Sequence, residues 1–247
     1  MTKVTNSPLD VELHIPAHLD SVIAEVSSLY ETEVAPREAA LKHRLKDQSK
    51  FLDEQGRLHP EIIAARREIM AASGAKNIYS AHLPESLGGR GLGREDMIYV
   101  EEQVYGYGVD LNPALLSWSE GATPRLLKAH PHQKEQFTDP LVKGLKTSLH
   151  GVTETGAGSN LYDMKTNAVR KGSDWVLNGT KAYITNYFDA DVAQVLAITN
   201  PGGGRQSFTY FMFDTKEYAG KGYEIGQLYQ TMFGDGYTGE IHFKDMV

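Results

Sequence analysis

The sequence predicts a multidomain α+β protein, in which an N-terminal all-α helical bundle (residues 1–143) is followed by an antiparallel β-barrel (residues 144–247). Upstream of Pro140, apolar residues recur mostly at three- and four-residue steps, as one face of a helix requires. Downstream of Lys143, short runs rich in β-branched and aromatic residues follow one another with no helical pattern between them. A run of predicted helices followed by a run of predicted strands indicates two domains rather than alternating βαβ units.

Helices are expected in the first half wherever helical spacing coincides with a signal for a helix end. Residues 60–74 open with Pro60 and close with Gly74, an asymmetry typical of helix termini. A loop with a defined shape is expected at residues 83–93, because its four glycines permit positive φ and close backbone approach. One further helix is predicted to begin near Leu19. Others are predicted at about 94–107, 113–129 and 132–139.

The second half is expected to consist of short strands joined by tight turns. Asn178-Gly179 predicts a type I′ hairpin turn, since that turn needs positive φ at both central residues. A second turn is predicted at residues 201–204, with residues 210–213 returning from it. The predicted strands are 147–153, 165–171, 175–177, 181–185, 192–199, 207–213 and 239–243.

Composition excludes several classes of function. The 247 residues include 25 Lys and Arg against 32 Asp and Glu, and this net charge of −7 disfavours nucleic acid and anionic membranes as partners. No stretch approaches the ~20 apolar residues of a membrane span, so a cytoplasmic location is expected. There is no cysteine, so redox chemistry would need a cofactor. The histidines lack the spacing of a metal site, and no metal is expected.

Two segments carry the functional signal: Thr153-Glu-Thr-Gly-Ala-Gly-Ser-Asn160 and Lys181-Ala-Tyr-Ile-Thr-Asn186. If both reach the same end of the barrel, they offer a flat ring backbone donors, hydroxyls and an aromatic wall. A dinucleotide fingerprint is disfavoured, because Leu161 stands where the third glycine should be and no crossover helix is predicted. From the residues alone, a simple glycine-rich turn in a barrel stays an alternative.

In order and spacing, residues 144–160 and 175–186 resemble the middle domain of the acyl-CoA dehydrogenases. Residues 83–92, 100–102 and 133–134 resemble that family's N-terminal helical domain, and residues 232–234 and 240–245 resemble the last strands of its middle domain. The resemblance covers about residues 20–247 and does not extend to the family's C-terminal helical bundle.

The resemblance implies FAD as the cofactor and an acyl-CoA as the substrate. It implies that one set of residues lies against the flavin and the acyl-CoA, with Ser159 also contacting the substrate: Val152, Thr153, Gly158 and Ser159. A second set would cover another part of the flavin ring: Tyr183, Ile184 and Thr185.

The implied activity is that of a flavoprotein oxidoreductase of fatty-acid and lipid metabolism. It would abstract an α-proton from a CoA thioester, transfer a β-hydride to the flavin, and be reoxidised by an electron-transfer partner. In the family the base is a glutamate of the C-terminal bundle, so it is expected outside this chain and no catalytic residue is assigned here. Glu154 lies inside the first segment, but its place between strand and turn favours a structural role.

Two alternatives stay open. The chain could be a short subunit, completed in trans by another chain that carries the C-terminal domain, or it could be a non-catalytic flavin- or CoA-binding interaction module. A homo-oligomer is also expected from the resemblance, because the family often forms dimers or tetramers.

Overall fold

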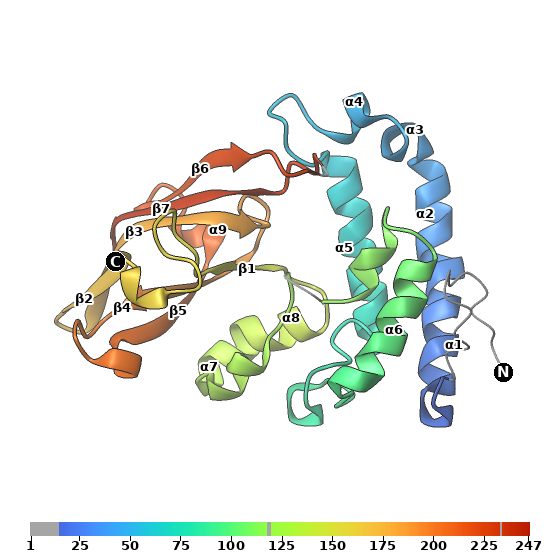
Figure 1. Cartoon of the computed structure of the whole chain (residues 1–247), viewed down its shortest axis with the longest axis horizontal. Helices are drawn as coiled ribbons and strands as arrows, with labels where there is room; N and C mark the ends of the chain where they lie inside the picture. Colours follow the sequence, from blue (N-terminus) through green and yellow to red (C-terminus); the bar gives the residue numbers. More distant parts are fainter. Residues whose placement is uncertain (1–14, 118–119, 233) are drawn as a thin grey trace.

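The structure, a computed structural model, describes residues 15–117, 120–232 and 234–247 (Figure 1). Helices occupy the first half of the chain and strands the second, which confirms the predicted fold class. The helices of the first half are η1 Ala17–Leu19, α1 Asp20–Leu29, η2 Tyr30–Val34, α2 Ala35–Ala40, α3 Lys42–Leu45, α4 Gln48–Phe51, α5 Pro60–Ala75, η3 Glu85–Leu87, α6 Arg94–Gly106, η4 Asn112–Leu115, η5 Pro124–Lys128, α7 Pro131–Gln133, η6 Lys134–Thr138 and α8 Asp139–Val142.

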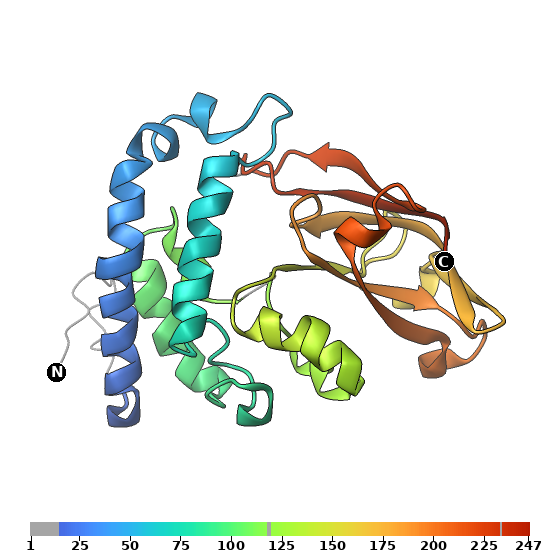
Figure 2. The ribbon, with the colours of Figure 1, turned by 180° about the vertical axis from the view of Figure 1, so that it is seen from behind.

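The helical half is built around α5, α6 and the long rod of α1 and α2, which lie side by side in both views (Figures 1 and 2). Their facing side chains form one apolar core, in which Val26, Ile69, Val100 and Val104 are fully shielded from solvent. The helices predicted at 60–74 and 94–107 are therefore confirmed, because their apolar faces meet in this core.

The helix predicted at 113–129 is wrong. The described residues of this segment form two short 3-10 turns, η4 and η5. Leu116 after η4 is extended (φ −124°, ψ 142°), and so is Thr123 directly before Pro124 (φ −123°, ψ 159°). A residue before proline is disfavoured in the helical region, so Pro124 separates the two turns. The helix expected at 132–139 lies within a longer helical stretch that begins at Pro131 and ends at Val142.

The second half forms one curled sheet in the order β1-β4-β2-β3-β7-β6, with β5 paired to β4. Most neighbours are antiparallel, as expected, but β1 and β2 each run parallel to β4, so the sheet is mixed and forms a half-barrel. The strands are β1 Ser148–Gly151, β2 Asn167–Lys171, β3 Asp174–Thr185, β4 Val192–Ile198, β5 Phe208–Asp214, β6 Tyr223–Tyr229 and β7 Thr238–Met246. Short helices η7 Leu161–Asp163, η8 Gly204–Ser207 and α9 Thr215–Tyr218 lie between them.

The hairpin predicted at Asn178-Gly179 is wrong, because the runs on either side of it belong to the single strand β3. The turn between β2 and β3 is Gly172-Ser173, since Lys171 pairs with Asp174. Gly179 instead lies at a register shift between β3 and β7, with a φ of +143°. A Cβ at this position would lie 2.5 Å from the Thr166 hydroxyl, so close approach of two backbones explains this glycine.

The turn expected at residues 201–204 is confirmed, and it joins β4 to its antiparallel partner β5. The sequence pattern missed β6, which pairs with β7 at the edge of the sheet. The resemblance at residues 232–234 includes Phe233, which lies outside the described residues.

The two halves meet through charged side chains of α5. Arg67 donates hydrogen bonds to the Asp191 carboxylate at 2.8 Å and to the Asp189 carboxylate at 2.8 and 3.0 Å. Asp191 also accepts from the backbone N–H of Thr147, directly before β1. This network fixes the start of β1, the strand that leads into the first functional segment. The division into domains at 143/144 stays a prediction.

Candidate functional site

The first functional segment leaves the end of β1 and folds into a tight turn. The Glu154 N–H donates to the Ala157 carbonyl at 2.9 Å, and the Ala157 N–H donates back to Glu154 at 3.1 Å. Thr155 and Gly156 form the exposed tip of this turn, and Gly158, Ser159 and Asn160 continue along the surface. The segment is therefore anchored at Glu154 and open to solvent beyond it.

The second functional segment lies directly beside the first. The Ala182 N–H donates to the Thr153 carbonyl at 2.9 Å, and the Lys181 ammonium donates to the Val152 carbonyl at 3.0 Å. Residues 29 positions apart in the sequence are thus joined by hydrogen bonds where the end of β1 meets β3. The structure brings the two sequence-predicted segments together.

A buried ion pair holds this junction. The Lys181 ammonium lies 3.0 Å from the Glu154 carboxylate, which also accepts backbone N–H bonds from Lys165 at 2.8 Å and Thr166 at 2.9 Å. Burial alone would raise the pKa of Glu154, but these hydrogen bonds outweigh it and lower the pKa. Burial lowers the pKa of Lys181, and Glu154 opposes that shift. A carboxylate held by three partners serves a structural role, as expected for Glu154.

Tyr183 presents an aromatic ring beside the segments. It lies in a bulge of β3 opposite β7, where its φ is +60°, and its side chain is 57% exposed. The ring stacks on that of Tyr229 in β6, with 4.7 Å between centroids, and the Tyr229 hydroxyl donates to Glu240. Tyr229 therefore packs against one face of the Tyr183 ring, and the rest of that ring is open to solvent.

The remaining predicted residues differ in what they can offer a ligand. Val152, Thr153 and Thr185 are partly exposed, whereas the side chain of Ile184 is only 2% exposed and packs in the core of the sheet. Ile184 can therefore contribute its backbone but not its side chain. At Gly158, an added Cβ would meet nothing within 4 Å, so the space beside this glycine is open. The arrangement offers hydroxyls, free space and an aromatic face to a flat, electron-accepting ring.

Sequence reasoning missed a second cluster, formed by Arg125, His150 and Tyr210. Arg125 donates to the Tyr210 hydroxyl at 3.0 Å and contacts the Nδ1 atom of His150 at 3.0 Å. Burial, together with the charge of Arg125, lowers the pKa of His150 to about 4. The neutral imidazole can therefore accept a hydrogen bond from the guanidinium. No motif signals this cluster, because its members come from η5, β1 and β5.

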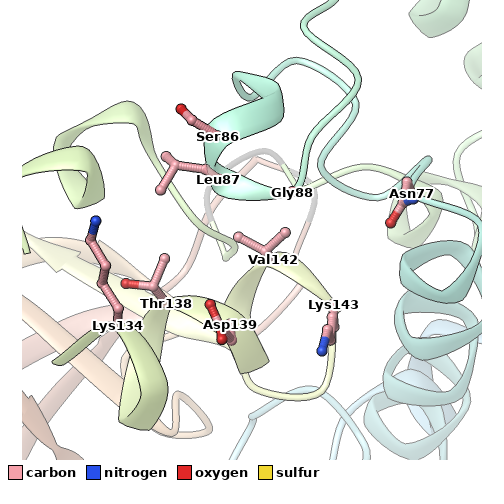
Figure 3. Close-up of a pocket in the computed structure, with 9 residues that line it drawn as sticks. All are labelled: Asn77, Ser86, Leu87, Gly88, Lys134, Thr138, Asp139, Val142 and Lys143. Carbon is pink, nitrogen blue, oxygen red and sulfur yellow. The ribbon is translucent and has the colours of Figure 1, made fainter. Parts of the chain in front are cut away.

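A polar hollow of about 270 Å³ lies between η3 and the helical stretch from α7 to α8 (Figure 3). Lys134 and Lys143 stand at opposite ends of this hollow, and Asp139 lies between them (Figure 3). The hollow thus carries charges of both signs. Among the described residues, no group of His, Cys, Asp or Glu side chains could hold a metal ion. No helix in the described ranges is long and apolar enough to cross a membrane.

Comparisons with known proteins identify relatives of this chain in sequence and in structure. A family model described as "Acyl-CoA dehydrogenase, middle domain" matches residues 150–246. The probable acyl-CoA dehydrogenase fadE25 of Mycobacterium leprae is 27% identical over 224 residues, which cover 90% of this chain and 52% of the relative. The chain thus spans about half the length of the curated relatives it matches.

Two solved structures share the fold. An acyl-CoA dehydrogenase complexed with FAD from Bacillus anthracis superposes with a TM-score of 0.68 at 23% identity, covering 98% of this chain and 37% of that one. A chain of the ChsE4-ChsE5 complex from Mycobacterium tuberculosis superposes with a TM-score of 0.70 at 20% identity, covering 95% and 55% respectively. At these identities the likeness concerns the fold alone.

Proposed function

We propose that this chain takes part in FAD-dependent α,β-dehydrogenation of a CoA thioester, because the family model of the acyl-CoA dehydrogenase middle domain matches residues 150–246. In this proposal it supplies the side of the active site that faces the flavin and the acyl-CoA. The observation that carries the proposal is the pairing of the two functional segments through Ala182 and Thr153 at 2.9 Å.

The residues present fit a flavin. An isoalloxazine ring has a flat aromatic face and an edge of nitrogen and oxygen acceptors. The exposed ring of Tyr183 suits the face. The partly exposed Thr153 hydroxyl and the exposed Ser159 hydroxyl suit the edge, and the open space beside Gly158 allows backbone N–H groups to approach. We assign cofactor contacts to Val152, Thr153, Gly158, Ser159, Tyr183, Ile184 and Thr185, with Ile184 acting through its backbone.

When bound, FAD supplies the acceptor for the hydride that leaves the β-carbon of the thioester. The Thr153 hydroxyl and neighbouring amides would stabilise negative charge at the ring edge as preorganised donors. Loss of one such donor in comparable oxyanion sites costs about 2.7–4 kcal/mol. Ser159 would in addition contact the acyl-CoA.

The proposal places the base that removes the α-proton outside these residues. Such a base needs a carboxylate within about 3 Å of the reacting carbon and free to take up the proton. Glu154 does not meet this need, because Lys181, Lys165 and Thr166 occupy its oxygens. We therefore propose that a glutamate from another part of the enzyme, in the same protein or in a partner chain, supplies the base.

Assembly follows from the same reasoning. We propose either a homo-oligomer or a complex in which a second chain brings the C-terminal helical domain, with an electron-transfer protein as the oxidant of the reduced flavin. The ChsE4-ChsE5 complex, one chain of which has a similar fold, is an example of a complex with two kinds of chain. A cytoplasmic location stays a prediction from the sequence.

The test is a reduction assay with the purified chain, FAD and a panel of straight-chain, branched and aryl CoA thioesters. The dehydrogenase proposal expects loss of flavin absorbance near its visible maximum once the base is supplied, by this protein or by an added partner chain. Flavin that binds and is never reduced by any thioester, with or without the partner, would favour the non-catalytic interaction module instead.

A further inference from the structure

A cavity of about 230 Å³ lies where η5 and α7 face the strands β4 and β5, apart from the two functional segments. Its lining combines basic and polar side chains with the apolar Leu126, Ala129, Phe211 and Met212, although the whole chain carries a net charge of −7. The described residues place no carboxylate in it. The polar and charged members of the lining are Arg125, Lys128, His130, Gln133, Gln194 and Tyr210.

Arg125 is held in place without an acidic partner in this lining. Its guanidinium donates to the Tyr210 hydroxyl at 3.0 Å, contacts His150 at 3.0 Å, and lies 4.5 Å from the centre of the Tyr210 ring. An arginine offers five N–H donors in a fixed plane, and these contacts use two of its nitrogens. The side chain is therefore oriented, charged and still able to donate.

Lys128 adds a second positive charge on the same side. Arg125 and Lys128 are three residues apart in η5, and side chains at that spacing eclipse one another in a 3-10 helix. Gln133 adds an amide donor, because its side-chain oxygen already accepts the backbone N–H of His130 at 3.0 Å. Donors thus converge on the cavity from three residues, with two positive charges among them.

From this convergence we propose that the cavity binds a phosphoryl group. A phosphate monoester carries about −1.5 to −2 charges at neutral pH and three acceptor oxygens, which matches two cations and an amide better than a carboxylate does. Arginine with a preset plane is also the residue best suited to phosphate oxygens. The hollow of Figure 3 lacks this match, because Asp139 lies between its two lysines. None of the residues that we assign to the flavin lines this cavity.

The experiment is a calorimetric titration of the full chain with inorganic phosphate, at constant ionic strength and with acetate as the carboxylate probe. Phosphate is expected to bind, and acetate to bind at least about tenfold more weakly, because it carries a single charge. Arg125→Gln is expected to weaken phosphate binding by about tenfold or more, and Lys128→Gln by several-fold. Lys143→Gln, which removes a surface lysine outside the cavity, is the matched control and should bind phosphate as the unmodified chain does.

Phosphate binding that is unchanged in both Arg125→Gln and Lys128→Gln, equal loss in Lys143→Gln, or equally tight acetate would overturn the proposal. Circular dichroism checks the fold of each variant, and Lys128→Gln, which changes an exposed side chain, provides the test if Arg125→Gln does not fold.

A parallel titration with FAD and with CoA identifies the source of the phosphoryl group. A nucleotide whose affinity falls in Lys128→Gln as well as in Arg125→Gln places its phosphates in the cavity. Unchanged affinities for FAD and for CoA leave free phosphate or another phosphorylated compound as the ligand. Failure of FAD to bind would count against the proposed function alone.

Discussion

The ammonium of Lys181 lies 3.0 Å from the carboxylate of Glu154, and the two side chains are 0% and 8% exposed. Each residue belongs to one of the two functional segments, so this pair joins them inside the sheet. Glu154 also fixes the start of the path to β2 through the N–H groups of Lys165 and Thr166. One buried ion pair therefore sets the relative position of the loop and the strand that we assign to the cofactor.

Removal of Lys181 is expected to destabilise the fold strongly. In Lys181→Met the Glu154 carboxylate stays buried without its counter-charge, and breaking a buried pair in this way typically costs about 3–5 kcal/mol. The measurement is the free energy of unfolding in urea. Lys171→Met, which removes an exposed lysine of β2, should change it by no more than about 0.5 kcal/mol. Equal losses in the two variants would contradict the structural role of the pair.

Substitution by alanine is expected to reduce stability at Gly179 and FAD binding at Gly158. At Gly179 an alanine Cβ would lie 2.5 Å from the Thr166 hydroxyl at a φ of +143°, so Gly179→Ala should lose about 1–3 kcal/mol of stability or more. At Gly158 the added Cβ meets nothing within 4 Å, so Gly158→Ala should keep its stability and bind FAD more weakly. Urea unfolding and FAD titration separate the two effects. A stable Gly179→Ala variant would contradict the close approach at β3.

The fold should lose stability as the pH falls from 6.5 towards 4, partly because of His150. Its pKa is lowered from 6.5 to about 4 in the folded state, so between these values the unfolded chain binds a proton that the folded chain does not. By linkage this one group contributes up to about 1.4 kcal/mol of lost stability per pH unit. His150→Gln should show a shallower dependence of the urea midpoint on pH over this window. An unchanged slope would contradict burial of a neutral imidazole.

The order of helices and strands could be predicted from the sequence, because apolar periodicity reports which face of each element is buried. The true place of Asn178-Gly179 could not be predicted, because a dipeptide typical of a hairpin turn can also occupy an irregularity inside a strand. Here Asn178 instead bonds to Asp245 of β7, accepting its backbone N–H at 2.9 Å. That partner is 67 residues away in the sequence, so the local sequence pattern does not predict the contact.

The edge strand β6 escaped prediction for a similar reason. Its pairing with β7 shifts register between Ile225 and Leu228, and the bulge interrupts the alternation that marks a strand. The two functional segments were visible as motifs, but their contact depends on the ion pair of Lys181 and Glu154. The cluster of Arg125, His150 and Tyr210 depends on three elements meeting in space, so no single stretch of sequence contains it.

The most direct test of the cofactor assignment is a titration of FAD, followed by visible absorbance, with the unmodified chain and two threonine variants. Thr153→Val removes the hydroxyl assigned to the flavin, whereas Thr155→Val removes one at the exposed tip of the same turn. We expect a perturbed flavin spectrum with the unmodified chain and with Thr155→Val, and about tenfold weaker binding with Thr153→Val. A flavin spectrum that stays that of free FAD with the unmodified chain, or equal affinity in all three proteins, would contradict the cofactor assignment.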